Sequence, residues 1–450
     1  MDKKNPIPID DEMIHLNEKW IEWQTTFNRL FLFKPTRTKS KIEIQIHYAR
    51  IMMAIVVGKK LHNKGAKIDM AQLIKAMADY SLAMYDKCSS YGFHSELTGF
   101  SSNIMREFNV AMPFLQAFNK YSELRKSLSK KRALSLMDDP LDQTFLAFIA
   151  VISLTELLNG FKPDYFRSLV STECHLEQQL SLCCEDLPGF KKTITNRAHI
   201  QLSPWEFKDG YFKLVGFDKP TKEIKRLLQL LCDWQEKLIP IQRWTNFLAH
   251  ETGTNVRVQN DLQHSYAMTL LAMFVLGKIK EGNALDEELI LECVVMHDLG
   301  EAYLGRDILY SHKSSQTDAE EYVAFSKSIE KLDDISRYDL ERAFLLQFCL
   351  DADYEAFPEY ARDIMAELKA NKSREALVFA AVEHFDYFMF ELENYRKGNE
   401  YLFYHTTGKC DVWEKLIQQF PDLAKIMPPE ILNWIKEFRE NYQGDKTPPL

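Results

Sequence analysis

The chain has 450 residues and a formal net charge of −9, with 46% hydrophobic and 27% charged residues. This composition is typical of an ordered globular protein, and the length favours two or more domains because single hydrophobic cores stop growing at shorter lengths. The acidic balance argues against extended nucleic acid as a partner, since such binding needs clustered Lys and Arg. The sequence has no run of about 18 apolar residues and no signal-type N-terminal core, which favours a cytoplasmic protein without a membrane partner.

The eight cysteines do not resemble a disulfide framework, because such frameworks belong to small secreted proteins. We therefore expect reduced thiols. Cys174, Cys183 and Cys184 lie close enough in sequence to raise a zinc knuckle as an alternative, but no CxxC spacing supports it. Buried free cysteines are the simpler interpretation.

Apolar residues recur at three- and four-residue spacing along most of the chain, and this pattern predicts an all-α fold. Alternating patterns typical of strands are scarce. Helices are expected, in chain order, at 43–61, 69–86, 141–158, 222–238, 262–279, 287–300, 319–332, 340–350 and 373–396. We divide the chain into an N-terminal helical lobe (1–160), an irregular linker or insertion (161–221), a second helical domain (222–402) and a C-terminal helical extension (403–450).

Two parts of the chain resemble each other, which indicates an internal duplication. The segment QIHYA at 45–49 matches QHSYA at 263–267, and further matches place Tyr80-Ser81 opposite His297-Asp298 and Thr155 opposite Asp386. Ile46 takes the place of His264, so the N-terminal copy would lack these polar side chains. The alternative is a chance likeness between amphipathic helices rich in Ala, Met and Val.

Four metal-ligand side chains, His264, His297, Asp298 and Asp386, fall on predicted helices of the C-terminal half. His297 follows Cys293 and Val294 by four and three residues, so it shares their apolar helix face, and Asp298 lies about 100° further around a regular helix. Asp386 shares a face with apolar residues, where a carboxylate needs a cation or several donors. Each residue alone has an ordinary alternative, a hydrogen-bonded core histidine or an Asp–Arg pair. The four together favour a metal site.

Two imidazoles and two carboxylates suit one divalent ion, with Mn, Co, Fe, Zn and Mg all compatible. Such an ion binds a phosphate oxygen and lowers the pKa of water. Glu301 lies four residues after His297, on the same helix face, and is placed to orient that water or to transfer protons.

The order H…HD…D, with HDLGE at 297–301, resembles the HD-domain metal-dependent phosphohydrolases. The flanking segments are similar to the bacterial 5′-deoxynucleotidase type: Arg-Trp at 243–244, Val-Arg-x-x-Asn at 256–260, His-Ser at 264–265 and a Glu- and Gly-Asn-containing end of the last helix. The likeness covers about 238–402. It implies an HD-domain helical bundle at 222–402, and a degenerate HD-like lobe at 1–160 if the repeat is real.

The resemblance also implies roles for individual residues. His264, His297, Asp298 and Asp386 would bind the metal, and Glu301 would be the catalytic acid/base. Arg243 would hold the substrate phosphate, and Trp244 would line the sugar and disfavour a 2′-hydroxyl. In this chain Arg306 separates Gly305 from Asp307, whereas in the family the acidic residue follows the Gly directly. Either Asp307 reaches the site through a bulged turn, or Arg306 supplies a phosphate contact.

We therefore predict hydrolysis of nucleotide phosphate esters, with 5′-dephosphorylation of deoxyribonucleoside monophosphates preferred. The alternatives are a dNTP triphosphohydrolase, a phosphodiesterase for cyclic or modified nucleotides, and a nucleotide sensor without turnover. Because the short enzymes of this type are dimers, the resemblance favours either a monomer with an internal pseudo-dimer or a homodimer.

Overall fold

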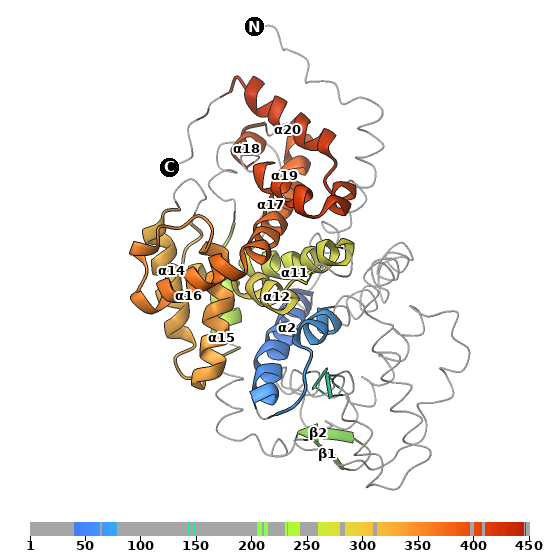
Figure 1. The fold of residues 1–450 in the computed structure, drawn as a ribbon, viewed down its shortest axis with the longest axis vertical. Helices are drawn as coiled ribbons and strands as arrows, with labels where there is room; N and C mark the ends of the chain where they lie inside the picture. Colours follow the sequence, from blue (N-terminus) through green and yellow to red (C-terminus); the bar gives the residue numbers. More distant parts are fainter. Residues whose placement is uncertain are drawn as a thin grey trace, which may run out of the picture. The chain divides into compact units, whose positions relative to one another are not determined.

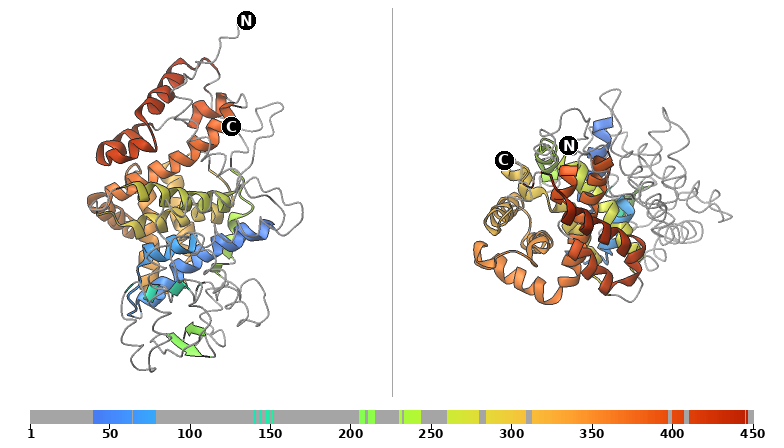
Figure 2. Two further views of the ribbon diagram at one scale, coloured as in Figure 1. Left: turned by 90° about the vertical axis from the view of Figure 1, so that its right-hand side faces the viewer. Right: turned by 90° about the horizontal axis from the view of Figure 1, so that it is seen from above.

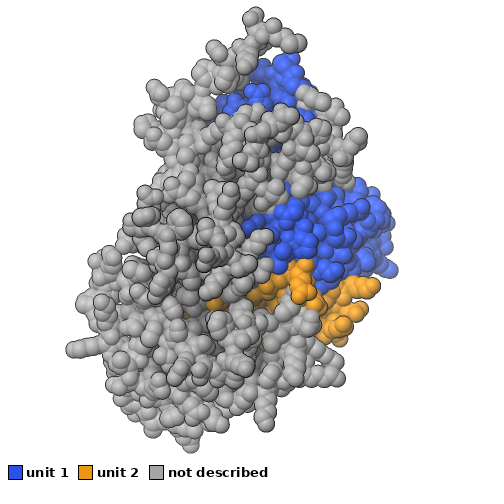
Figure 3. All heavy atoms as spheres, turned by 180° about the vertical axis from the view of Figure 1, so that it is seen from behind, with its two compact units in different colours: residues 1–36, 237–325, 342–450 blue, residues 37–236, 326–341 orange. Residues whose placement is uncertain are grey.

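The fold is described from a computed structural model of the chain. The structure describes residues 40–63, 65–78, 140, 143–144, 147–148, 151, 205–208, 211–214, 230–231, 233–243, 260–279, 284–308, 313–396, 400–406, 410–444 and 446. The chain divides into two compact units (Figure 3). Unit 1 comprises Met1–Thr36, Lys237–Phe325 and Arg342–Leu450, and unit 2 comprises Arg37–Glu236 and Ser326–Glu341.

Three helices form the centre of unit 1: α11 (Asp261–Lys278), α12 (Glu287–Met296) and α17 (Ser373–Arg396). They pack against one another, with α11 and α12 side by side in both Figure 1 and Figure 2. Helix α11 begins at a capping box, in which the Asn260 side chain accepts from the Gln263 backbone N–H and the Gln263 side chain accepts from the Asn260 backbone N–H. Helix α11 is buried on nearly all sides, as its apolar sequence requires.

The segment expected as one helix at 287–300 is two helices in the structure. Helix α12 ends at Met296, His297 and Asp298 form the junction, and α13 (Leu299–Leu304) follows. Both junction residues keep right-handed helical φ/ψ values. The single-helix expectation was wrong at His297-Asp298, because apolar spacing continues across the junction and carries no sign of the break.

Helix α13 ends at Gly305, whose φ of 76° is in the left-handed region that glycine adopts without strain. The next part of unit 1 contains most of α14 (Ser315–Ser328), the end of α15 (Asp334–Leu345), the 3₁₀ turns η3 (Leu346–Phe348) and η4 (Tyr354–Ala356), and α16 (Glu359–Asn371). Phe325 and Phe344 stack with ring centroids 4.1 Å apart and join α14 to α15.

The C-terminal helices also belong to unit 1. They are α18 (Glu400–Thr406), α19 (Cys410–Gln419), the 3₁₀ turn η6 (Pro421–Lys425) and α20 (Pro429–Asn441). Both α18 and α19 pack against α17, and α20 packs against α19. Aromatic contacts join these elements, such as Phe385 with Trp413 and Phe403 with Trp434.

Unit 2 contains α2 (Ser40–Asn63), helical residues 70–78 and a short hairpin of β1 (Trp205–Lys208) and β2 (Tyr211–Leu214). The strands are antiparallel, with Lys208 paired to Tyr211. Lys59 lies 3.8 Å from Asp339, and the Asn63 amide donates to Ser336. The hairpin lies in the segment that the sequence pattern assigned to a linker or insertion.

The all-α prediction is confirmed, with this one hairpin added among the residues that the structure describes. Within the same residues, no helix is long and apolar enough to cross a membrane. Cys293, Cys349 and Cys410 are buried free thiols, as expected. Tyr80, Ser81, Thr155 and the cysteines at 174, 183 and 184 lie outside the described residues, so the proposed repeat and the domain boundaries drawn from the sequence stay predictions.

Candidate metal centre

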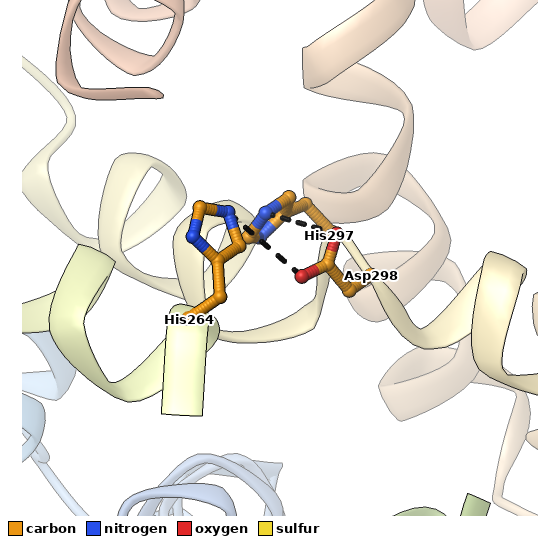
Figure 4. Close-up of side chains that lie close together, drawn as sticks. All are labelled: His264, His297 and Asp298. Atoms are coloured by element: carbon orange, nitrogen blue, oxygen red, sulfur yellow. Dashed lines mark ion pairs between the residues drawn. The ribbon is translucent and has the colours of Figure 1, made fainter. Parts of the chain in front are cut away.

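His264, His297 and Asp298 come together in the interior of unit 1 (Figure 4). His264 comes from α11, and the other two come from the α12–α13 junction. One ligand atom from each residue lies within 4.8 Å of the other two, and the three residues are at most 3% exposed. The junction brings His297 Nε2 to 3.2 Å from Asp298 Oδ1, and His264 Nε2 lies 3.9 Å from Asp298 Oδ2.

The two imidazoles are oriented by their other ring nitrogens. His297 Nδ1 donates to the Val294 carbonyl oxygen at 2.8 Å, which requires Nδ1 to carry the proton. His264 Nδ1 lies 2.7 Å from Asp386 Oδ2, which favours the same tautomer. The Nε2 lone pair of each ring is then directed to the centre of the group. A carboxylate or carbonyl behind a histidine is the usual arrangement in metal sites.

The three ligand groups fit a divalent metal. Both Nε2 atoms are buried and make no hydrogen bond with the residues that the structure describes, and leaving such atoms without a partner is costly. Burial lowers the pKa of His297, which keeps its ring neutral and able to coordinate. Two nitrogens and a carboxylate suit a borderline divalent ion and do not select one.

Asp386 lies behind His264 and is not a member of the three-residue group. Its side chain, on α17, is 12% exposed. The structure therefore brings three of the four predicted ligands together and places the fourth in contact with one of them. Direct metal binding by Asp386 stays a prediction.

Arg243 is buried and holds Asp298. Its Nη1 atom donates to both carboxylate oxygens of Asp298 at 3.1 Å, and its Nη2 atom donates to the Tyr387 hydroxyl at 3.1 Å. The same Nη1 lies 3.6 Å from Asp261 Oδ1, and Asp261 is fully buried. Burial opposes ionisation of Asp298, but its interactions with the His297, Arg243 and His264 side chains outweigh it and lower the pKa of this carboxyl. Asp298 is thus held as the carboxylate that a metal requires.

Glu301 lies one helical turn after Asp298 and is held by two groups. Lys313 Nζ lies 2.7 Å from Glu301 Oε1, and the Ile308 backbone N–H donates to Oε2 at 3.4 Å. Burial raises the pKa of Glu301 to about 7, although Lys313 opposes the increase. A carboxyl with such a pKa exchanges protons near neutral pH, which suits an acid/base residue.

The remaining predicted site residues are less closely engaged. Asp307 is half-buried beyond α13 and acts electrostatically on Glu301 and Arg243. The Arg306 side chain is 61% exposed and lies 3.8 Å from Glu320. Trp244 is outside the described residues. The predicted sugar and phosphate roles of Trp244 and Arg306 therefore stay predictions.

Four neighbours of the site were not found from the sequence: Asp261, Lys313, Glu321 and Tyr387. Asp261 and Tyr387 are adjacent to predicted features, a helix start and Asp386, but their proximity to Arg243 depends on tertiary packing. No spacing rule connects Lys313 or Glu321 to Glu301. The sequence offers no signal for this pair.

A comparison with protein families agrees with this geometry. Residues 248–424 match the family model described as HD domain. The match supports membership of the HD-domain superfamily for this part of the chain, which contains the three clustered residues, Asp386 and Glu301. No curated protein and no solved structure matches the chain. HD domains are typically metal-dependent phosphohydrolases, and this chain holds a buried His-His-Asp group that can bind a metal.

Proposed function

We propose that the HD domain hydrolyses nucleotide phosphate esters, with 5′-dephosphorylation of deoxyribonucleoside monophosphates as the main reaction. The observation that carries the proposal is the convergence of an ionised carboxylate with two Nε2 atoms that make no hydrogen bond to the described residues. They lie beside Glu301, a carboxyl whose pKa is raised by burial to about 7. The deoxynucleotide preference rests on the sequence resemblance around Arg243-Trp244.

His264, His297 and Asp298 would hold the divalent ion, and Asp386 would support it through His264 or bind it directly. A bound ion of this kind supplies Lewis-acid chemistry, neutralising phosphate charge and lowering the pKa of water. Arg243 fixes Asp298 and contributes positive charge close to the phosphate position. Glu301 accepts a proton from the attacking water and returns it to the leaving alcohol oxygen.

A phosphate-release screen tests this proposal. The protein is incubated with dNMPs, NMPs and dNTPs in the presence of Mn, Co, Mg, Fe or Zn, and free phosphate is measured. Asp298→Ala should lose turnover. Asp334→Ala is the control and should retain turnover, because the Asp334 side chain is 92% exposed. Phosphate from dNMPs, with little from NMPs, is the expected result.

The products distinguish the other reactions from this one. Release of triphosphate from dNTPs would indicate a triphosphohydrolase, and a linear nucleotide from a cyclic substrate would indicate a phosphodiesterase. Nucleotide binding without hydrolysis under every metal condition would overturn the enzymatic proposal and indicate a sensor. An Asp298→Ala variant with full activity would show that the reaction occurs elsewhere.

A further inference from the structure

Lys313 bridges two buried glutamates next to the candidate metal centre. Its Nζ atom lies 2.7 Å from Glu301 Oε1 and 3.6 Å from Glu321 Oε1. The two glutamate side chains are 3% and 0% exposed, and the lysine side chain is 28% exposed. No sequence pattern predicted a role for Lys313 or Glu321.

A buried carboxylate without a partner is costly, and two of them close together are more so. Burial raises the pKa of Glu301 and that of Glu321. Burial also acts to lower the pKa of Lys313, but the two carboxylates outweigh it and raise this pKa. Lys313 therefore stays protonated and supplies the positive charge that lets Glu301 ionise in this interior. Glu321 Oε1 contacts the same ammonium at 3.6 Å.

The backbone around the pair leaves Glu301 little freedom. Helix α13 approaches α14 so closely that a Cβ atom on Gly300 would lie 2.7 Å from the Glu321 Cβ and 2.7 Å from its carbonyl oxygen. The Ile308 backbone N–H holds the second Glu301 oxygen. Three features thus restrict Glu301: the close approach of α13 to α14, the hydrogen bond from the Ile308 N–H and the contact with Lys313.

We propose that Lys313, anchored by Glu321, is a positioning residue that holds the Glu301 carboxylate in its working orientation one helical turn from Asp298. This inference rests on the proposed function, because it concerns the acid/base group of the same site. Lys313 acts through Glu301 and needs no contact with the substrate. Its closeness to Glu301 sets it apart from Arg306, which is directed to solvent and to Glu320.

The charged groups that act on Glu301 come from several elements. Lys313 lowers its pKa most strongly, and Arg243 also lowers it, whereas Asp298 and Asp307 raise it. Glu321, on α14, adds a further negative charge. Removing Lys313 leaves Arg243 as the one cation in this set, and Arg243 is already bonded to Asp298. Glu301 would then hold its proton to higher pH.

The test compares Lys313→Met, Lys313→Arg and Glu321→Gln with the unmodified protein. Lys372→Met is the matched control, because Lys372 also bridges two carboxylates, Asp286 at 2.8 Å and Glu375 at 3.8 Å, and is 24% exposed. Rates are measured as kcat and KM across pH on the best substrate, together with bound metal and thermal unfolding. The infrared spectrum of each protein is compared with that of the same protein carrying Glu301→Gln in addition. The difference between the two spectra follows the C=O band of the protonated Glu301 carboxyl.

Lys313→Met should lower kcat about 100-fold at neutral pH, within the range typical of losing an acid/base residue, with KM and bound metal little changed. The acid limb of the pH profile and the infrared titration of Glu301 should both move to higher pH. Lys313→Arg should recover most of the rate, Glu321→Gln should give an intermediate loss, and Lys372→Met should keep the original profile.

An unchanged infrared titration of Glu301 in Lys313→Met would overturn the inference, whether or not the protein is active. A lower rate with an unshifted profile, or an equal loss in Lys372→Met, would also overturn it by showing a general structural effect. Absence of phosphate release from every nucleotide in the unmodified protein would instead overturn the proposed function, and the infrared titration would still decide whether Lys313 controls Glu301.

Discussion

His264 Nδ1 lies 2.7 Å from Asp386 Oδ2, and this contact joins α11 to α17 across the interior of unit 1. It directs the opposite ring nitrogen, Nε2, toward Asp298. A carboxylate in this position fixes the tautomer and the orientation of the ring and makes it a stronger metal ligand. Asp386 therefore contributes to the site even where it does not coordinate the ion itself.

The first prediction concerns the charge of Asp386. Asp386→Asn should weaken metal affinity by about 10- to 100-fold, because an amide oxygen still accepts from His264 but lacks the negative charge. Asp386→Ala should lose more affinity and also turnover, since His264 then loses its orienting partner. Isothermal titration with Mn or Co measures both losses.

The control for this pair is Asp363→Asn, at a carboxylate on α16 outside the cluster, which should bind metal normally. Equal affinities for Asp386→Ala and the unmodified protein would contradict both direct coordination and the orienting role. A loss of metal affinity in Asp386→Asn well beyond the range typical of supporting residues would indicate that Asp386 coordinates the ion directly.

The second prediction concerns Arg243, whose guanidinium holds both oxygens of Asp298 and the Tyr387 hydroxyl. Arg243→Lys keeps the charge but cannot make all these contacts at once, because an ammonium lacks the planar fork. We expect about tenfold weaker metal binding, typical of a lost supporting contact, and a higher KM for the nucleotide. Titration calorimetry and steady-state kinetics measure the two effects separately.

Tyr387→Phe removes only the hydroxyl contact and should have the smaller effect on metal affinity. Normal metal affinity in Arg243→Lys combined with a raised KM would show that Arg243 acts on the substrate alone. The reverse combination would show that it acts through Asp298 alone.

The sequence was sufficient to predict α11 and α17, the helices that carry His264 and Asp386. Helix α17 was expected at 373–396, the same residues as in the structure, and α11 differs by one residue at each end. Buried helices with long apolar faces produce strong periodicity, and His264 and His297 stood out because they interrupt such faces. Because these two histidines lie on apolar faces, we could predict that their side chains point into the interior and serve as ligands.

Other features depend on information that periodicity does not contain. The break at His297-Asp298 preserves helical φ/ψ and so leaves no mark in the apolar pattern. The pairing of Lys313 with Glu301 depends on tertiary packing, which periodicity does not encode. The β1–β2 hairpin was different, because Asp209-Gly210, a recognised turn signal of hairpins, separates the alternating segment WEFK from the aromatic-rich segment YFKL.

The third prediction concerns Asp286, the N-cap residue of α12. This helix leads directly to His297. Its side chain accepts from the Leu289 backbone N–H at 3.1 Å and lies 2.8 Å from Lys372 Nζ. Asp286→Ala should lower the free energy of unfolding by about 1–2 kcal/mol, as for other lost caps. Asp286→Asn should lose less, because its amide oxygen still caps the helix. Urea unfolding measures both differences.

The pH dependence of this effect follows from the direction of the shift. Burial opposes ionisation, but the hydrogen bonds from Lys372 and the Leu289 N–H outweigh it and lower the pKa of Asp286 from its ordinary 3.8. The charge therefore stabilises the folded protein above pH 3.8, and this contribution is lost as the pH falls through the lower folded pKa. The stability difference between the protein and Asp286→Asn should shrink in that acidic range. A difference that grows toward acid would contradict the assignment.

The fourth prediction concerns Gly300, where α13 meets α14. An added methyl group would lie 2.7 Å from the Glu321 Cβ, 2.7 Å from its carbonyl oxygen and 2.9 Å from Phe344 Cζ. Because backbone and ring atoms cannot move aside cheaply, Gly300→Ala should destabilise the protein by about 1–3 kcal/mol despite the better helix propensity of alanine. The displacement should also separate Glu301 from Lys313 and lower kcat.

Gly305→Asn is the matched control, since Gly305 caps the same helix and an added Cβ would have no heavy atom of the described residues within 4 Å. Asparagine also tolerates the φ of 76° at this position. This variant should keep both stability and the Glu301–Lys313 contact. Unfolding curves and kcat, measured on the two variants together, separate crowding at the α13–α14 contact from any general intolerance of α13 to substitution. If Gly300→Ala matched Gly305→Asn in both measurements, the close approach of the two helices would have no part in placing Glu301.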